Sequence, residues 1–462
     1  MAGIGFELRK LSLTGTLSDR MASSAHGAII ATGPWLFTIA SLAAITLATH
    51  TVVDHETLST FRVMVFYGFF LSMIVSAPAL VTGVRMVADA IYSENIEQIA
   101  SIFLHCAWYA VLPVTVVAIL VYFTLFALPL FAGLMAVATC VLTSLIWVAI
   151  AFCSAIRDYK YITVAFTVGM LAAVLDAILM AFLGHGAEGM LAGLNLGLCV
   201  IVVILFNRLF LTFPHPIRAT PGYATWFIKE MANNWLLCLG TFVAALAIWI
   251  DKFILWNSSF AESVSWGLRH APAYDSALFI SFLCIIPALS QYVTHTETRF
   301  YEQCQKYYND ISRHSCWKEI NKNANEIRTQ TVETIFSIFI KHVIVCGVFF
   351  IMGPAILKLA GLQYYQLSIY RLGVLGVIFH FLFFACSSII IFLNRQRIFI
   401  RLQIMFLLAN GMFTMVCLSL GSNYLGFGYF FACVVCSIVA YFSMLQVLRD
   451  INFTTFIANN EL

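Results

Sequence analysis

The sequence predicts an all-α polytopic membrane protein with about twelve transmembrane helices in two six-helix lobes. Of its 462 residues, 61% belong to the set AVILMFWYC and only 10% are Asp, Glu, Lys or Arg. The mean hydropathy is +0.92. Soluble domains carry about 25% charged residues, so this chain has too little charge to face water on all sides. The composition excludes a soluble enzyme, a disordered regulator and a nucleic-acid binder.

Long stretches without charge mark the predicted spans. A helix needs about 20 largely apolar residues to cross a bilayer, because lipid offers no partner for exposed backbone groups. The chain holds enough such stretches for twelve helices, counting 98–156 and 402–448 as two each. Asp176 and Lys341 are the charges inside them. The stretches are 21–53, 63–84, 98–156, 161–187, 189–207, 231–250, 276–296, 334–357, 372–394 and 402–448.

The loops between these spans predict the orientation. With the N-terminus inside, nineteen Lys and Arg residues fall in inner segments and five in outer ones. Cytoplasmic loops carry the excess of Lys and Arg, so both termini are expected in the cytoplasm. The first apolar stretch is far longer than the core of a signal peptide. We therefore expect a multi-pass membrane protein without a cleavable signal peptide.

Two halves and a joint between them are expected. Residues 1–210 form an N-terminal six-helix lobe, 211–228 a cytoplasmic linker, and 229–462 a C-terminal six-helix lobe. An even number of helices in each half fits a parallel repeat, and a Pro-Ala-Leu tripeptide occurs in the second helix of each half, at 78–80 and 287–289. Three prolines and a glycine between 208 and 226 predict an extended chain there.

The longest polar segment, 295–333, is predicted to be an amphipathic helix or helix pair on the cytoplasmic face. Its apolar residues recur every three or four positions, and six basic residues lie between them. Two interpretations remain open for this segment. It is either a connector that lies along the membrane or a dock for a cytoplasmic partner.

Sequence motifs for catalysis are missing. The chain has no GxxxxGK[ST] loop for nucleotide hydrolysis, no HExxH pair and no soluble stretch of domain size. Cys433 and Cys436 have a CxxC spacing but lie in the middle of a predicted span without a second pair. No catalytic residue, cofactor or metal ion is therefore predicted, and a transporter is favoured over an enzyme.

Two ionisable residues inside spans are candidate coupling sites. Asp176 is expected near the middle of the fifth helix, where a carboxylate is costly and often functional. It is predicted to couple protons or cations, although a buried structural partner is the alternative. Lys341 lies nearer the inner end of the ninth helix, where a long side chain can reach the interface.

Further candidates lie near the ends of spans. Arg85 and Asp89 stand four residues apart on one helical face and can form an ion pair or gate the cytoplasmic mouth. Asp251 and Lys252 lie between Trp249 and Trp256 near the outer end of the seventh helix. Asp275 is expected at the outer start of the eighth helix. For Asp251, Lys252 and Asp275, an anchoring role and a transport role are equally favoured.

Two glycine patterns predict backbone geometry. Gly33 and Pro34 lie early in the first helix, where proline removes a backbone donor, so they form a candidate hinge. Gly189, Gly193 and Gly197 form consecutive GxxxG steps, which allow a neighbouring helix to approach closely.

Several segments resemble the PelG family, the inner-membrane transporters of the Pel exopolysaccharide system. The decapeptide at 1–10, MAGIGFELRK, is the most specific of them. The resemblance spans nearly the whole chain, including its length and helix layout. The other matching residues are Gly33-Pro34-Trp35, Thr82 with Arg85, Ala88-Asp89 with Tyr92, Asp251-Lys252 with Trp256, and Glu297-Thr298 with Phe300-Tyr301-Glu302.

The resemblance implies a MOP-flippase-like fold with two six-helix lobes around a central cavity. It implies an N-acetylgalactosamine-rich polysaccharide as substrate, made by a cytoplasmic glycosyltransferase. It further implies inner-membrane Pel components as partners, one of them a cyclic di-GMP sensor, and a role in biofilm formation. The lipid bilayer is the surrounding medium, and no nucleic acid is expected.

The expected function is transport of a nascent polysaccharide from cytoplasm to periplasm. Three alternatives stay open at the level of sequence. A lipid-linked oligosaccharide flippase would need a basic inner cavity, and few basic residues lie within the spans. A cation-coupled antiporter of the same superfamily would use Asp176. A scaffold that only anchors a glycosyltransferase would depend on the 295–333 segment.

Overall fold

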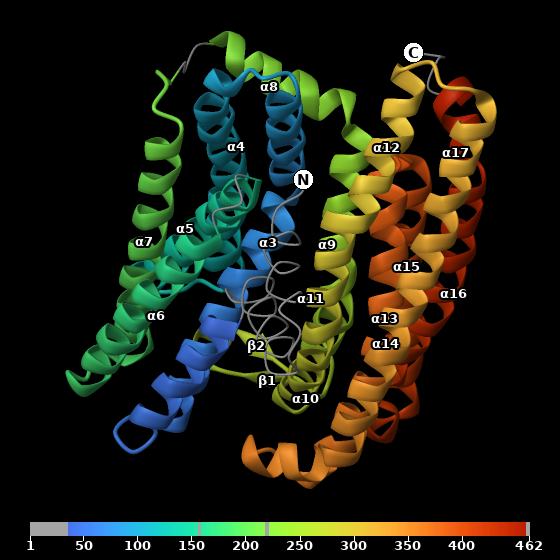
Figure 1. The fold of residues 1–462 in the computed structure, drawn as a ribbon. Coiled ribbons are helices and arrows are strands. Elements are labelled where there is room, and N and C mark those ends of the chain that lie inside the picture. The colour runs from blue at the N-terminus through green and yellow to red at the C-terminus, as the bar shows by residue number, and fades with distance from the viewer. Residues whose placement is uncertain (1–35, 156–158, 218–220, 459–462) are drawn as a thin grey trace, which may run out of the picture. The chain divides into compact units, whose positions relative to one another are not determined.

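The computed structural model describes residues 36–155, 159–217 and 221–458. In this part of the chain, eleven helices are long and apolar enough to cross a membrane, and a shorter apolar helix covers Leu36–Thr49. The predicted first span, 21–53, is described only from residue 36 onward. The all-α prediction and the positions of the eleven later predicted spans are confirmed (Figure 1).

Contacts along the chain divide it into two compact units. Among the described residues, the N-terminal unit contains 36–249 and Trp256–His270, and the C-terminal unit contains Ile250–Leu255 and 271–458. The division therefore falls within one helix, α9 (Trp235–Trp256). The two-lobe boundaries proposed from the sequence stay a prediction.

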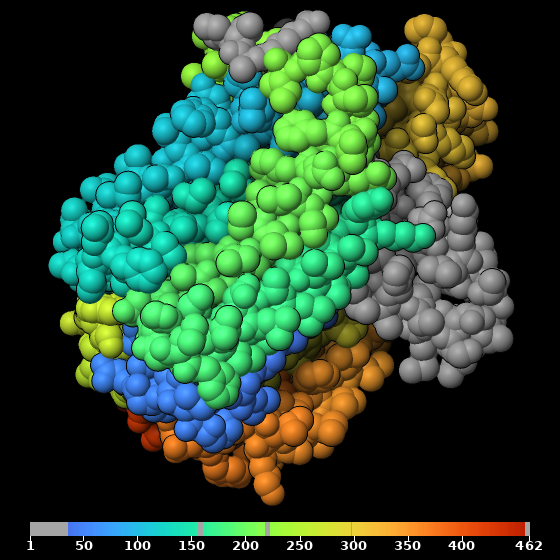
Figure 2. Space-filling view, turned by 90° about the vertical axis from the view of Figure 1, so that its left-hand side faces the viewer, coloured from blue at the N-terminus to red at the C-terminus, as the bar shows by residue number. Residues whose placement is uncertain are grey.

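The N-terminal unit is built on five long helices that precede α8 and α9. The turn predicted at 127–129 is present, since helix ends at Leu125 and begins again at Leu130. Figure 2 shows the packed side chains of α4 to α7 on one face of this unit. Its elements are α3 (His55–Tyr92), η1 (Ile96–Gln98), α4 (Ile99–Ile119), η2 (Leu120–Leu125), α5 (Leu130–Ala155), α6 (Tyr159–Phe182), α7 (Gly186–Thr212), α8 (Pro221–Asn233), β1 (Glu262–Ser263), η3 (Ser265–Gly267) and β2 (Arg269–His270).

Glycines bring α6 and α7 into close contact. A Cβ placed on Gly193 would lie 2.6 Å from backbone atoms of Asp176 and Ala177, and one on Gly197 would lie 2.3 Å from the carbonyl oxygen of Gly169. Only a residue without a side chain fits such a spacing. The close approach predicted from the GxxxG steps is confirmed.

An aromatic cluster packs α3 against α9, and one hydrogen bond joins α3 to the short β-ribbon. The rings of Tyr67 and Trp256 stack with centroids 5.1 Å apart, and Phe66 contacts Trp249 at 4.9 Å. The Tyr67 hydroxyl donates a hydrogen bond to the carbonyl oxygen of Arg269, at 2.8 Å. The two tryptophans that the sequence places near an interface are therefore packed against other rings.

The C-terminal unit is arranged around α14, the most buried of the eleven long helices. It packs against α10, α13 and α16. The break predicted at 421–428 is present, between Leu420 and Phe427. The elements are α10 (Pro272–Phe282), η4 (Leu283–Ile285), α11 (Ile286–His295), η5 (Thr296–Phe300), α12 (Tyr301–Ser312), α13 (Trp317–Leu359), η6 (Tyr364–Gln366), α14 (Leu367–Phe392), α15 (Gln396–Leu420), η7 (Ser422–Tyr424), α16 (Phe427–Arg449), α17 (Ile451–Phe453) and η8 (Thr454–Ala458).

Two expectations for the polar segments need correction. The joint at 208–226 is not extended throughout, because α7 runs to Thr212 and α8 begins at Pro221. The segment 295–333 does form a helix pair, but its helices continue the spans. In particular, α13 has 43 residues, or about 65 Å at 1.5 Å per residue, against a hydrocarbon core of about 30 Å. The polar half of α13 therefore extends its apolar half (Figure 1).

Candidate functional site: two carboxylates within the spans

A buried ion pair lies in α9. The Asp251 side chain is fully buried and the residue Lys252 is 7% exposed. The Lys252 Nζ lies 3.3 Å from Oδ1 and 3.4 Å from Oδ2 of Asp251, so one ammonium contacts both carboxylate oxygens. Because adjacent helical positions do not face each other, the flexible lysine stem must fold back to make this contact.

Helix α10 supplies a third polar group. The hydroxyl of Tyr274, which is also buried, donates a hydrogen bond of 2.7 Å to Oδ2 of Asp251. The neighbouring Asp275 has a different role, because its Oδ2 accepts a hydrogen bond from the Ala271 N–H at 2.9 Å. With Pro272 as the first residue of the helix, Asp275 stabilises the start of α10.

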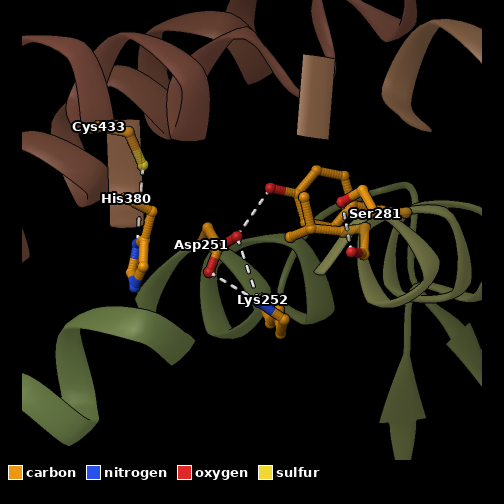
Figure 3. Close-up of polar contacts among 7 residues, drawn as sticks. Asp251, Lys252, Ser281, His380 and Cys433 are labelled. Carbon is orange, nitrogen blue, oxygen red and sulfur yellow. Dashed lines mark hydrogen bonds and ion pairs between the residues drawn. The ribbon is translucent and has the colours of Figure 1, made fainter. Parts of the chain in front are cut away.

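His380 of α14 and Cys433 of α16 lie beside the pair (Figure 3). The Cys433 Sγ and His380 Nδ1 are 3.9 Å apart. The imidazole packs against the rings of Phe282, Phe406 and Tyr429, with centroids 5.4 to 6.0 Å away. The segment Ile250–Leu255 of α9 and three helices of the C-terminal unit, α10, α14 and α16, thus converge on this small polar region.

The geometry favours a stabilising role for the Asp251–Lys252 ion pair. Both carboxylate oxygens contact donors within the protein, and the paired charges sum to zero. A cation that approached Asp251 would have to displace the Lys252 ammonium from a buried site. Such an arrangement holds α9 against α10, and the Asp251–Lys252–Tyr274 cluster therefore favours the anchoring interpretation.

Asp176 has a different environment in the N-terminal unit. It lies in α6, its side chain is half-buried, and its backbone faces Gly193 of α7. Within the described ranges, no hydrogen bond or ion pair holds its carboxylate. The expectation that it lies mid-helix is wrong, because α6 ends at Phe182 and Asp176 therefore lies in the last two turns. It is nevertheless inside a candidate span.

The remaining predicted residues are spread over the fold. Arg85 and Asp89 lie near the C-terminal end of α3, where Arg85 is half-buried and Asp89 exposed. Lys341 is exposed on α13. The candidate hinge, Gly33 and Pro34, lies outside the described residues. Among the residues that the structure describes, no group of three His, Cys, Asp or Glu side chains could hold a metal ion.

Sequence reasoning missed Tyr274 and His380 as members of the buried cluster. His380 lies in the middle of an uncharged stretch and was not counted because neutral histidine carries no formal charge. Treating histidine as an ionisable residue inside a span would have found it. Tyr274 directly precedes Asp275, but nothing in the sequence shows that its hydroxyl reaches Asp251.

The fold is similar to that of solved multi-pass transporters of the MOP superfamily. A MATE family multidrug-resistance transporter in an outward-facing conformation matches with a TM-score of 0.66 and 15% identity, over 93% of this chain and 96% of that chain. A MATE protein in a bent conformation matches at 0.65 and 12%, over 98% and 99%. A MOP superfamily transporter from Pyrococcus furiosus, whose binding pocket is described as having reverse polarity, matches at 0.61 and 13%, over 93% and 96%.

The chain belongs to the PelG family, described as "Putative exopolysaccharide Exporter (EPS-E)", whose model matches residues 1–456. The resemblance seen in the sequence is thereby confirmed. The match covers both units, and together with the fold it makes the chain a membrane transport protein for exopolysaccharide. Comparison with curated protein sequences gave no match.

Proposed function

We propose that this protein moves a nascent Pel-type polysaccharide, rich in N-acetylgalactosamine, from the cytoplasm to the periplasm. It does so in a bacterial inner membrane, with both termini in the cytoplasm. The match of the PelG family model to residues 1–456 is the observation that carries this proposal. The excess of Lys and Arg in the predicted inner loops supports the orientation.

Partner proteins supply the polymer in this proposal. The chain carries no nucleotide-hydrolysis motif, and the largest polar region described, α12 with the first half of α13, is only a helix pair. Synthesis is therefore assigned to a cytoplasmic glycosyltransferase. Inner-membrane Pel components, including a cyclic di-GMP sensor, complete the proposed assembly.

Asp176 is proposed as the carboxylate that couples transport to a proton or cation gradient. Its side chain lies within a candidate span, is only half-buried, and is not neutralised by a lysine among the described residues. Asp251, in contrast, already has an ammonium against both oxygens. A carboxylate that binds and releases a cation must be able to change its partner, which favours Asp176.

Cells that contain the partner synthase, with this chain present or deleted, test the proposal. Polymer that accumulates in the cytoplasm on deletion, and reaches the periplasm when the chain is restored, would support transport. Loss of synthesis with nothing trapped would instead identify a scaffold for the synthase. The second measurement is the amount of synthase in the membrane. If this chain only transports the polymer, its deletion should leave that amount unchanged.

A cation-coupled antiporter is the second candidate function. The MATE-like fold and the carboxylate of Asp176 favour it. Efflux of small cationic dyes from cells that lack the polymer synthase separates the two functions. Dye efflux that depends on this chain would favour the antiporter, whereas polymer export without dye efflux would favour the proposed function.

A further inference from the structure

A cavity of about 490 Å³ opens near the start of α14 in the C-terminal unit, apart from the buried ion pair. Its volume lies in the range of small-ligand sites, about 300–1,000 Å³. The walls come from α13, η6, α14 and the first residue of α16. Besides three leucines, the lining residues are Phe350, Tyr364, Tyr365, Ser368, Arg371 and Phe427.

Arg371 supplies the charge of this cavity. It lies in the second turn of α14, with its guanidinium carbon 4.9 Å from the centroid of the Phe350 ring. The Nε of Arg371 is buried and has no hydrogen-bond partner among the described residues. A buried guanidinium donor without an acceptor is costly, and a ligand oxygen would satisfy it.

The backbone around the cavity also favours an anion. Tyr364 and Tyr365 begin the helical stretch that continues as α14, and Phe427 begins α16. Gln363 and Gln366 form a capping box at the start of η6, whereas α16 has no side-chain cap, so the partially positive end available at the cavity is that of α16. No acidic residue occurs among the described residues that line it. The cavity therefore matches a negatively charged ligand.

The apolar part of the lining favours an amphiphilic ligand. Three leucines and four aromatic rings surround the single guanidinium, which is far more apolar surface than a free inorganic anion needs. Tyr364 and Tyr365 are 79% and 64% exposed at the end of a candidate span. Tyrosines in this position are typical of the membrane interface, where lipid headgroups lie.

We propose that this cavity binds an anionic phospholipid. Its phosphate lies at Arg371 and the N-terminus of α16, and the upper part of its acyl chain lies against the leucines and rings. The proposal is independent of the polymer transport proposed above. It names a lipid site on the C-terminal unit alone, formed by α13, η6, α14 and α16.

Native mass spectrometry of the full-length protein in detergent tests the site. Phosphatidylglycerol and phosphatidylcholine with the same acyl chains are added, and retained lipid is counted. Wild type should retain phosphatidylglycerol in preference. Arg371→Gln should lower that retention about tenfold, the equivalent of one charge-assisted contact. Lys358→Gln is the matched control, since it removes a positive charge near the end of the same helix bundle but not from the cavity lining.

A second variant keeps the test valid if Arg371→Gln folds poorly. Ser368 is exposed and lines the cavity, so Ser368→Phe should fill the space and displace phosphatidylglycerol without removing any charge. The proposal would be overturned if the wild type retained both lipids equally. It would also be overturned if Arg371→Gln and Lys358→Gln retained phosphatidylglycerol equally.

Soluble competitors distinguish a bound phospholipid from a soluble phosphate or a sugar. Glycerol phosphate should compete only weakly, because it lacks the acyl part. Complete displacement of the lipid by glycerol phosphate would overturn the lipid assignment in favour of a soluble phosphate. Displacement by a neutral oligosaccharide would overturn it in favour of a sugar subsite, where aromatic rings stack on the saccharide.

Discussion

Asp176 of the N-terminal unit and Asp251 of the C-terminal unit are both carboxylates within candidate spans, yet their surroundings differ in every respect. Asp251 is fully buried, contacts Lys252 through both oxygens and accepts a hydrogen bond from Tyr274. Asp176 is half-buried on a helix that packs backbone to backbone against α7. The Asp251 side chain is fixed by an ion pair, whereas Asp176 lies at the glycine-rich contact between α6 and α7.

This difference separates two ways of placing an acid in a membrane. A neutralised pair can stay buried permanently and fix the position of two helices. A carboxylate without a charged partner is costly unless it can take up a proton, a cation or water. The contacts of Asp251 favour a stabilising role, and those of Asp176 support the coupling role that we propose for it.

Lys252→Met should produce the largest loss of stability. It leaves the buried Asp251 carboxylate without its countercharge, and breaking a buried pair costs about 3–5 kcal/mol. Thermal unfolding of the purified protein in detergent measures the loss. Lys341→Met, at an exposed lysine of α13, should have little effect. Equal melting temperatures for the two variants would show that the pair does not stabilise α9. The double variant with Asp251→Asn should recover part of the loss.

Tyr274→Phe should have the next largest effect. The change removes one hydrogen bond to a buried carboxylate, worth about 1.5–3 kcal/mol when the acceptor is charged. Tyr370→Phe is the control, because the equally buried Tyr370 donates at 3.1 Å to a neutral carbonyl, that of Phe349. The same unfolding assay should show a smaller loss for Tyr370→Phe. A larger loss of stability for Tyr370→Phe would contradict a stronger hydrogen bond at the Asp251 carboxylate than at the neutral carbonyl of Phe349.

Gly193→Ala tests the close contact between α6 and α7 beside Asp176. The added methyl group would lie 2.6 Å from the backbone of α6, and overpacking of this kind costs about 1–3 kcal/mol. At Gly347 no atom lies within 4 Å, so Gly347→Ala should be neutral or slightly stabilising. Unfolding in detergent compares the two. A harmless Gly193→Ala would mean that α6 and α7 are not fixed at this spacing.

His270, outside the spans, should add a small dependence of stability on pH. Burial, with Arg62 and His55 nearby, lowers its pKa from 6.5 to about 4. Because the folded state resists protonation, the contribution of His270 is complete above pH 6.5 and declines as the pH falls toward 4. His270→Gln should flatten the fall in melting temperature over this window. His185→Gln, at an exposed histidine, should not, and an unchanged slope for His270→Gln would contradict the assignment.

Charge-free stretches were sufficient to predict the long helices, because lipid forces each span to satisfy its own backbone. The turn at 127–129 and the break at 421–428 followed from the same reasoning. The sequence could not show that α13 continues through the polar segment, since amphipathic and apolar stretches can belong to one helix. It also could not show where α6 ends, and Asp176 was placed too deep as a result.

The site was only partly accessible from sequence. Asp251 and Lys252 were recognised because charges inside or beside a span are rare. Their mutual contact depends on a side-chain conformation, and the contribution of Tyr274 depends on how α10 packs against α9. Neither follows from spacing, so the anchoring and transport interpretations stayed equal until the contacts were seen.

Polymer export by the Asp176→Asn variant, at the protein level of the wild type, tests the central claim most directly. Asparagine keeps the shape of the side chain and removes its ability to ionise. We expect polymer to be trapped in the cytoplasm of cells with this variant, while its melting temperature stays close to that of the wild type. Normal export by this variant would contradict the assignment of coupling to Asp176.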